Sequence, residues 1–207
     1  HCPNHIHAHR IDPVCAVRDD PQLPSLTIIT PVLNAAHLLR GCIASSADQD
    51  CEHLFIDGGS TDGSRELLQR TGALLIDAPG SGIYQAQNIG IEMAQGDWCY
   101  FMGADDRLRP AAVVALCNAL RGGEYQYARV KMRYGLPLMP RYMPMQQSWV
   151  YRRSLLIERG GFTARGLAEL PFNRSITDLP HVRTDVAMCD VATGGVSSRQ
   201  LGHGCFI

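Results

Sequence analysis

The sequence predicts an α/β protein built on a mostly parallel sheet with helices on both faces. Short apolar runs alternate with segments of helical pattern through the first half of the chain, which is the order of βαβ units. These runs lack polar alternation, as expected for strands that are covered on both faces. Polar clusters follow three of the runs directly, and ligands of such sheets bind beyond the strand ends.

Composition and charge limit the class of protein. The chain has 207 residues, of which 45% are hydrophobic and 19% charged, and this predicts one globular domain. We expect a flexible tail over 1–24, rich in Pro, His and Asp, and a single domain over 25–207. The net charge of −1 argues against nucleic acid as a partner. No apolar run approaches the ~20 residues that span a bilayer, and the cysteines form no CxxC pair, which favours free thiols in a reducing compartment.

The first predicted unit joins a strand over 25–30 to a helix over 35–46. The strand segment is apolar and β-rich, and Pro31 ends it. Asn34 is a favoured N-cap residue, and the spacing of apolar residues in 35–46 gives the helix one apolar face.

Two more units and a fourth strand follow. A strand over 53–56 leads through a polar loop into a helix over 63–71, which Gly72 ends. The other elements of this half are a strand over 73–76, a helix over 83–95 and a strand over 98–102. Right-handed crossovers between successive strands make this part of the sheet parallel.

The second half of the chain has a weaker pattern. No clear period is present over 162–185. The elements expected here are a helix from Pro110 to Leu120, a strand over 125–132, a loop over 135–147, a helix over 147–158 and a final strand over 186–191.

Polar residues follow three of the predicted strands at 30–34, 57–62 and 105–106. Because parallel strands end at the same edge of a sheet, these clusters are expected to lie together. Asp105 and Asp106 are the metal candidates, since Mg²⁺ and Mn²⁺ take one or two carboxylates together with phosphate oxygens. A capped turn or a solvated loop also explains such a pair. Asp106→Ala is expected to leave the fold intact, because a loop acid contributes little to a core.

Two further acids lie in the loop over 57–62. Asp57 and Asp62 can accept hydrogen bonds from a base and a sugar, while Gly58 and Gly59 allow a ligand to approach the backbone closely. An Asx-type turn, with Asp62 as the cap of the next helix, explains the same residues equally well.

Four segments in order resemble family-2 glycosyltransferases of the GT-A fold. The segment 26–34 resembles the opening strand of that family, 56–63 its DGSTDGS loop, 82–90 its GIYDAMNKG helix start, and 96–106 its acidic metal motif. The resemblance covers about 25–110. The later segments 147–154, 160–162 and 194–198 are similar to the branch that builds bacterial surface polysaccharides, including colanic-acid-type enzymes.

The resemblance implies site residues by position. It implies that 25–110 binds a nucleotide-sugar donor and that 111–207 faces the acceptor. The implied donor-binding residues are Thr30, Pro31, Asn34, Asp57, Ser60 and Asp62 around the nucleotide, Asn88 and Gly90 beside the ribose and diphosphate, Asp105 at the ribose or metal, and Asp106 on the metal itself.

The resemblance also implies a reaction. A Mn²⁺ or Mg²⁺ ion would hold a UDP- or GDP-linked sugar, and the sugar would pass with inversion to a hydroxyl of a saccharide or lipid-linked saccharide, in surface polysaccharide biosynthesis. This places the protein in the cytoplasm, with peripheral association at the inner membrane face as an alternative location.

The catalytic base is the least defined position. The family carries an acid shortly after a GGF segment, and the nearest match is Glu169, with Asp178 second and Asp185 third. Pro171 is expected to disturb the helix that presents this acid.

Two glutamines also depart from the family pattern. Gln85 replaces its Asp and Gln146 replaces its His, so two ionisable groups are absent. These departures support an alternative, a catalytically degenerate domain that binds a nucleotide-sugar. A sugar-phosphate nucleotidyltransferase is disfavoured, because 31–34 contains neither glycine nor a basic residue.

Overall fold

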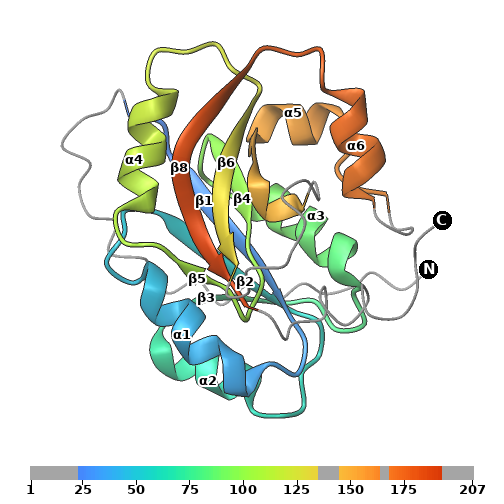
Figure 1. Cartoon of the computed structure of the whole chain (residues 1–207). Coiled ribbons are helices and arrows are strands. Elements are labelled where there is room, and N and C mark those ends of the chain that lie inside the picture. The colour runs from blue at the N-terminus through green and yellow to red at the C-terminus, as the bar shows by residue number, and fades with distance from the viewer. Residues whose placement is uncertain (1–22, 135–144, 164–167, 193–207) are drawn as a thin grey trace.

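A computed structural model describes residues 23–134, 145–163 and 168–192, so that most of the predicted tail lies outside the described part (Figure 1). The protein forms an eight-stranded sheet in the order β3-β2-β1-β4-β7-β6-β8-β5. The strands are β1 (Leu26–Val32), β2 (Glu52–Asp57), β3 (Leu74–Asp77), β4 (Trp98–Phe101), β5 (Arg107–Leu108), β6 (Tyr127–Tyr134), β7 (Trp149–Arg152) and β8 (His181–Val191). The helices are α1 (Ala36–Ser46), α2 (Ser64–Thr71), α3 (Ile83–Met93), α4 (Ala112–Leu120), α5 (Arg153–Glu158) and α6 (Glu169–Ser175), with a 3₁₀ turn η1 (Gln146–Ser148).

The half of the sheet built from the first half of the chain is parallel, as predicted. β3, β2, β1 and β4 pair in parallel, and each crossover between them contains one helix. β7 lies antiparallel between β4 and β6, β8 is parallel to β6, and β5 is antiparallel to β8. The strands β1 to β4, β6 and β8 therefore all end at the same edge of the sheet.

Helices cover both faces of the sheet, which confirms the predicted architecture (Figure 1). One hydrophobic cluster joins the sheet to α1, α2 and α4 through Leu39, Leu68 and Leu116, which are fully buried. A second cluster joins the opposite face to α3, α5 and α6 through Ile91, Leu156 and other side chains. Among the described helices, none is long and apolar enough to cross a membrane.

The helix expected over 147–158 is wrong in its first part. The structure has η1 and β7 there, and only α5, over Arg153–Glu158, is helical. Trp149, Val150 and Tyr151 are all buried, and β7 fills the space between β4 and β6. Aromatic and β-branched residues suit a strand that is buried on both faces, and this tertiary pairing decides the conformation.

The segment 162–185, for which the sequence predicts no element, contains α6 and the start of β8. Pro171 stands in the first turn of α6, where its missing N–H group has no intrahelical partner to lose. The expected disturbance of this helix by Pro171 is therefore wrong. β8 begins at His181, five residues before the predicted start, because its polar first half pairs with β6.

Candidate active site

Asp105 and Asp106 lie directly beyond the end of β4, on the edge where the parallel strands end. Their carboxylates converge over Gly103. A Cβ atom placed on Gly103 would lie 2.7 Å from Asp105 Oδ1 and 3.0 Å from Asp106 Oδ2. Glycine at this position thus leaves a small space that two carboxylate oxygens border.

Asp106 is held by hydrogen bonds from three segments. The backbone N–H of Gly103 donates to its Oδ2 at 3.0 Å, the Gln147 side chain donates to Oδ2 at 3.3 Å, and the N–H of Ala192 donates to Oδ1 at 3.2 Å. The residue is only 1% exposed. Asp106 thus connects the segment after β4, η1 and the end of β8. This corrects the expectation that Asp106, as a loop acid, contributes little to the fold.

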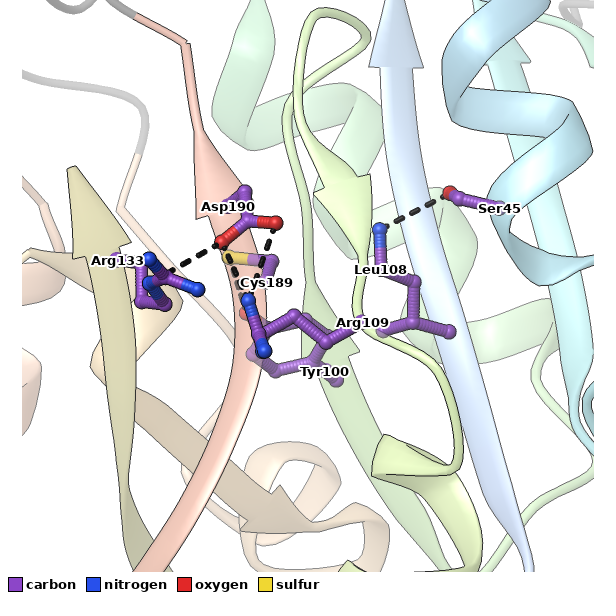
Figure 2. Close-up of polar contacts among 7 residues, drawn as sticks. All are labelled: Ser45, Tyr100, Leu108, Arg109, Arg133, Cys189 and Asp190. Carbon is purple, nitrogen blue, oxygen red and sulfur yellow. Dashed lines mark hydrogen bonds and ion pairs between the residues drawn. The ribbon is translucent and has the colours of Figure 1, made fainter. Parts of the chain in front are cut away.

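The end of β8 that presents Ala192 is itself fixed by ion pairs, as Figure 2 shows. Asp190 accepts a hydrogen bond from Arg109 at 2.9 Å and lies 4.0 Å from Arg133 Nε. These contacts join β8 to β6 and to the segment that follows β5. They hold the backbone that donates to Asp106.

Two more contacts in Figure 2 support the neighbouring strands. The Tyr100 hydroxyl lies 3.0 Å from Cys189 Sγ. It also lies 3.0 Å from the carbonyl oxygen of Gln147, a residue that Figure 2 does not draw. The N–H of Leu108 donates to Ser45 Oγ at 2.9 Å, which ties β5 to α1. The core thus positions Gln147 where its amide reaches Asp106.

Both carboxyl groups are in an environment that disfavours their negative charge. Burial raises the pKa of Asp105, and burial together with the charge of Asp105 raises the pKa of Asp106, against the hydrogen bonds that lower it. A divalent cation between them would remove this penalty, and hard carboxylate oxygens are its preferred ligands. The donor set therefore fits Mg²⁺ or Mn²⁺. Within the described residues, no group of three or more His, Cys, Asp or Glu side chains is arranged to hold a metal ion.

The loop after β2 surrounds the carboxylate of Asp57. This side chain is 1% exposed and accepts hydrogen bonds from the backbone N–H and the hydroxyl of Ser60. Gly58 bonds to the end of β1 through its N–H, and Gly59 has a φ of +102°, which favours glycine. Asp57 thus lies at the same edge of the sheet as the carboxylate pair.

Asn34 and Ser60 tie the loop after β1 to the loop after β2. The N–H of Asn34 donates to Ser60 Oγ at 2.9 Å, and Asn34 Oδ1 accepts from the N–H of Thr61 at 2.9 Å. The expected N-cap role of Asn34 is wrong: α1 begins at Ala36 and has no side-chain cap from Asn34, which has a left-handed φ of 51°. The inter-loop contacts hold this backbone conformation.

Asp62 forms the expected Asx-type turn at the start of α2 and also bonds to the start of α1. Its Oδ1 accepts from the N–H of Ser64 in an Asx-type turn, and its Oδ2 accepts from the N–H of Ala36 at the start of α1. These bonds lower the pKa of Asp62, with the Ser64 hydroxyl the largest cause. Asp62 therefore stabilises the N-terminus of α1 across the two loops.

Four of the predicted donor-binding residues lie in β1 and α3. Thr30 is fully buried, and its hydroxyl lies 2.9 Å from His53 Nε2, while Pro31 remains partly exposed at the end of β1. Asn88 holds the backbone of Phe162 from both sides, accepting from its N–H and donating to its carbonyl, each at 2.8 Å. A Cβ atom on Gly90 would lie 2.4 Å from Ile29 Cγ2, so Gly90 allows α3 to pack on β1.

Glu169 lies at the start of α6 and is brought to the start of α3. The Tyr84 hydroxyl donates to Glu169 Oε2, and Tyr84 follows the loop at the end of β3. Burial, and then the hydrogen bond with Glu169, raise the pKa of Tyr84. Glu169 is thereby held on the edge of the sheet where the strands end.

Asp178 and Asp185 are not brought to this edge. Asp178 is exposed and precedes the start of β8, whereas Ala192, next to Asp106, follows its end. The 11 residues of β8 separate these two ends by roughly 30 Å. Asp185 forms an ion pair with Lys131 in the exposed part of β8. Of the three acids considered as base, the structure leaves Glu169.

The sequence pattern does not reveal the contacts that several residues make at the site. Gln147 and the backbone of Ala192 reach Asp106 from segments that are far away along the chain. Tyr84 lies within a segment that carries the family resemblance, and its pairing with Glu169 needs the fold to be seen. Gln146 exchanges two amide hydrogen bonds with Gln87, at 2.8 and 3.1 Å, so it joins η1 to α3.

Comparison with known families gives one match over most of the chain. The model described as glycosyl transferase family 2 matches residues 27–171. A PGL/p-HBAD biosynthesis glycosyltransferase of Mycobacterium bovis is 38% identical over 108 residues, which are 48% of this chain and 42% of that protein. Glycosyltransferase AglJ of Haloferax volcanii is 38% identical over 73 residues, which are 35% of this chain and 24% of that protein. The chain thus spans under half the length of these curated relatives.

Solved structures share the fold at low sequence identity. Residues 1–349 of S. aureus TarS in complex with UDP-GlcNAc match with a TM-score of 0.72 at 15% identity, over 88% of this chain and 62% of that chain. The mannosyltransferase PcManGT from Pyrobaculum calidifontis, in complex with GDP-Man and Mn²⁺, matches with a TM-score of 0.68 at 19% identity, over 86% and 59%. These likenesses confirm the predicted GT-A architecture.

Proposed function

Because the chain belongs to glycosyl transferase family 2, we propose that it transfers a sugar from a UDP- or GDP-linked donor to an acceptor hydroxyl. The reaction depends on Mn²⁺ or Mg²⁺ and inverts the configuration at the anomeric carbon. The convergence of Asp105 and Asp106 over Gly103, at the edge where the parallel strands end, carries this proposal.

Different site residues contact different parts of the donor in this proposal. Asp106 and Asp105 would hold the cation, which would neutralise the negative charge that develops on the departing nucleoside diphosphate. The loop over 57–62, with Asp57 at its start and glycines at 58 and 59, receives the nucleoside. Asn34, Ser60 and Asp62 fix the shape of this loop through the hydrogen bonds between the two loops.

Glu169 is the proposed base. It accepts the proton of the acceptor hydroxyl while the acceptor oxygen bonds to the anomeric carbon and the bond from that carbon to the diphosphate oxygen breaks. A single displacement of this kind gives inversion. Tyr84 donates to Oε2 of Glu169, so the hydrogen bond fixes the rotamer and leaves the other carboxylate oxygen for the acceptor proton.

The pathway is proposed by analogy with the relatives. The mycobacterial relative is named for PGL/p-HBAD biosynthesis, and AglJ is named as a glycosyltransferase. We propose that the acceptor is a saccharide or lipid-linked saccharide of a surface polysaccharide or glycolipid, and that the protein works in the cytoplasm at the inner face of the membrane.

One observation supports the alternative of a domain that binds the donor without transfer. Asp106 is 1% exposed, and both of its oxygens already accept hydrogen bonds from the protein. If the hydrogen bonds to Asp106 persist, its oxygens do not bind a cation. The donor can then bind while sugar transfer stays slow.

Release of nucleoside diphosphate tests the proposal. The purified protein is incubated with UDP-glucose, UDP-GlcNAc and GDP-mannose, with Mn²⁺ or with EDTA, and water serves as the acceptor. We expect slow release that requires Mn²⁺ and is lost in Asp105→Asn. The matched control is Asp185→Asn, which removes an acid whose side chain is 95% exposed. Donor binding without release indicates the degenerate domain, and the absence of both contradicts the proposal.

A further inference from the structure

Two arginines stand directly opposite each other on adjacent strands. Arg129 in β6 and Arg183 in β8 are paired in register, and the two strands lie side by side in Figure 1. Directly opposed side chains of a strand pair point to the same face of the sheet, and like charges in that position are destabilising. Burial, and then the charge of Arg183, lower the pKa of Arg129.

The charge of this pair is not balanced by the described residues around it. No described carboxylate lies within ion-pair distance of either guanidinium group. The nearest acid along β8, Asp185, is bound to Lys131. Two adjacent positive charges without a partner favour the approach of an anion.

Arg129 also has a buried donor without an acceptor. Its guanidinium carbon lies 4.1 Å from the centre of the Trp149 ring, and Arg129 Nε and Trp149 Nε1 are both buried without a hydrogen-bond partner among the described residues. Trp149 is only 4% exposed, so its unpaired N–H group costs stability unless an acceptor binds it.

Two other arginines show that this is unusual in the chain. Arg152 lies over Trp98 in the same way, at 5.2 Å, yet its Nε donates to the carbonyl oxygen of Tyr125. Arg153 donates through Nε to the carbonyl oxygen of Ile91. The fold supplies acceptors to the Nε groups of these two arginines, whereas no described residue accepts from Arg129 Nε.

The strands around the arginine pair define its position in the sheet. Trp149 follows Gln147, which donates to Asp106, by two residues. Arg129 shares its face of the sheet with Tyr151, and both Arg129 and Glu169 are close enough to Tyr151 to affect its pKa in opposite directions. The pair therefore lies on the face of the sheet that α6 covers, near the start of β8 and away from the end that contacts Asp106.

We propose that Arg129 and Arg183 form a binding site for an oxyanion, namely the phosphate or carboxylate group of a small anionic ligand. Guanidinium groups match such oxygens in paired hydrogen bonds, and Trp149 Nε1 adds a third donor. The anion site itself rests only on the residues described above.

Binding of small anionic sugars tests the site without the reaction. Glucose, glucose 6-phosphate and glucuronate are titrated in EDTA by calorimetry, with tryptophan fluorescence as a second signal. We expect saturable binding of glucose 6-phosphate or glucuronate, whichever group the site prefers, and none of glucose. Arg183→Gln should weaken this binding at least tenfold. Arg183 is exposed, so this variant is expected to fold normally.

Controls separate this site from the donor site. Arg70→Gln removes an exposed arginine at the end of α2, which packs on the opposite face of the sheet, and should bind the anions normally. Asp106→Asn should also bind them normally, and Arg183→Gln should still bind UDP or GDP with Mn²⁺. No anion binding, or binding that Arg183→Gln leaves unchanged, overturns the proposal. Binding of wild type and Arg183→Gln to phosphatidylglycerol vesicles is measured as well. If Arg183→Gln weakens vesicle binding and leaves sugar binding unchanged, the pair is a membrane contact and the proposal is overturned.

Discussion

At the scale of single residues, Asp106 serves both the fold and the proposed chemistry. Its buried carboxylate accepts hydrogen bonds from Gly103, Gln147 and Ala192, so its removal leaves donors unsatisfied as well as a cation without a ligand. The two effects can be separated, because asparagine keeps an acceptor oxygen and loses the charge.

Asp106→Ala should lower the free energy of unfolding by about 1–3 kcal/mol, since buried donors lose their acceptor. Asp106→Asn should lower it less, and both variants should lose Mn²⁺-dependent release of nucleoside diphosphate by at least ~100-fold. Urea denaturation and the release assay measure the two quantities. Wild-type release by the asparagine variant would show that Asp106 is no metal ligand.

Glu169 can be tested against Asp178, since the structure separates them. Glu169→Gln should slow transfer at least ~100-fold while donor binding is retained, because a proton acceptor is lost and the donor site is untouched. Asp178→Asn is the matched control and should have no effect, since this acid lies beyond the opposite end of β8. Single-turnover rates and calorimetry with UDP or GDP give both measurements. An unchanged rate in Glu169→Gln would remove it as the base.

At the scale of elements, a partly buried histidine joins α1 to β1 and β2. His53 Nδ1 lies 2.7 Å from Ser46 Oγ in α1, and Nε2 lies 2.9 Å from Thr30 Oγ1 in β1. The ring also stacks on Phe55 at 4.0 Å. Burial lowers the pKa of His53 to about 3, so the imidazole is neutral in the folded protein at ordinary pH.

The lowered pKa of His53 predicts that the folded protein loses stability in weak acid. The folded-state pKa lies below the ordinary value of 6.5, so the unfolded chain binds a proton that the folded chain does not. The free energy of unfolding is therefore unaffected by the titration of His53 above pH 6.5 and decreases as the pH drops toward 3. The decrease at pH 5 is on the order of 1–2 kcal/mol. Urea denaturation of the protein and of His53→Gln at pH 7 and pH 5 measures it. An equal pH dependence in both proteins would contradict the assignment.

At the scale of the whole molecule, the two halves of the chain meet at one edge of one sheet. The first half supplies the loops after β1, β2 and β4, and the second half supplies Gln147, Glu169 and the backbone of Ala192. A ligand held between these segments should therefore stabilise the entire fold.

A nucleotide with its cation should raise the melting temperature. UDP or GDP at ~100 times its dissociation constant adds about 2.7 kcal/mol to the stability of the folded state. Thermal denaturation should show a higher melting temperature with nucleotide and Mn²⁺, and no such increase in EDTA. We expect one of the two nucleotides to give a clearly larger increase. An increase that is the same with EDTA would show that binding does not depend on a metal.

The sequence by itself determined the parallel half of the sheet and the acidic pair at its edge. Buried strands and amphipathic helices of the first half are local patterns, so the segments 26–34, 56–63 and 96–106 indicate their structure and their place without a partner. The carboxylate pair after β4 is likewise visible because ligands of such sheets bind where the strands end.

The tertiary structure alone decided the elements and contacts that depend on distant partners. β7 is a strand because it pairs with β4 and β6 on its two sides. Asn34 does not cap α1 because its side chain bonds to the loop after β2. Glu169 and Asp178 are both acids near α6, and only the direction of β8 places one at the site and the other at the far end. Local pattern cannot encode these outcomes, because the energy that selects them comes from residues far away in the sequence.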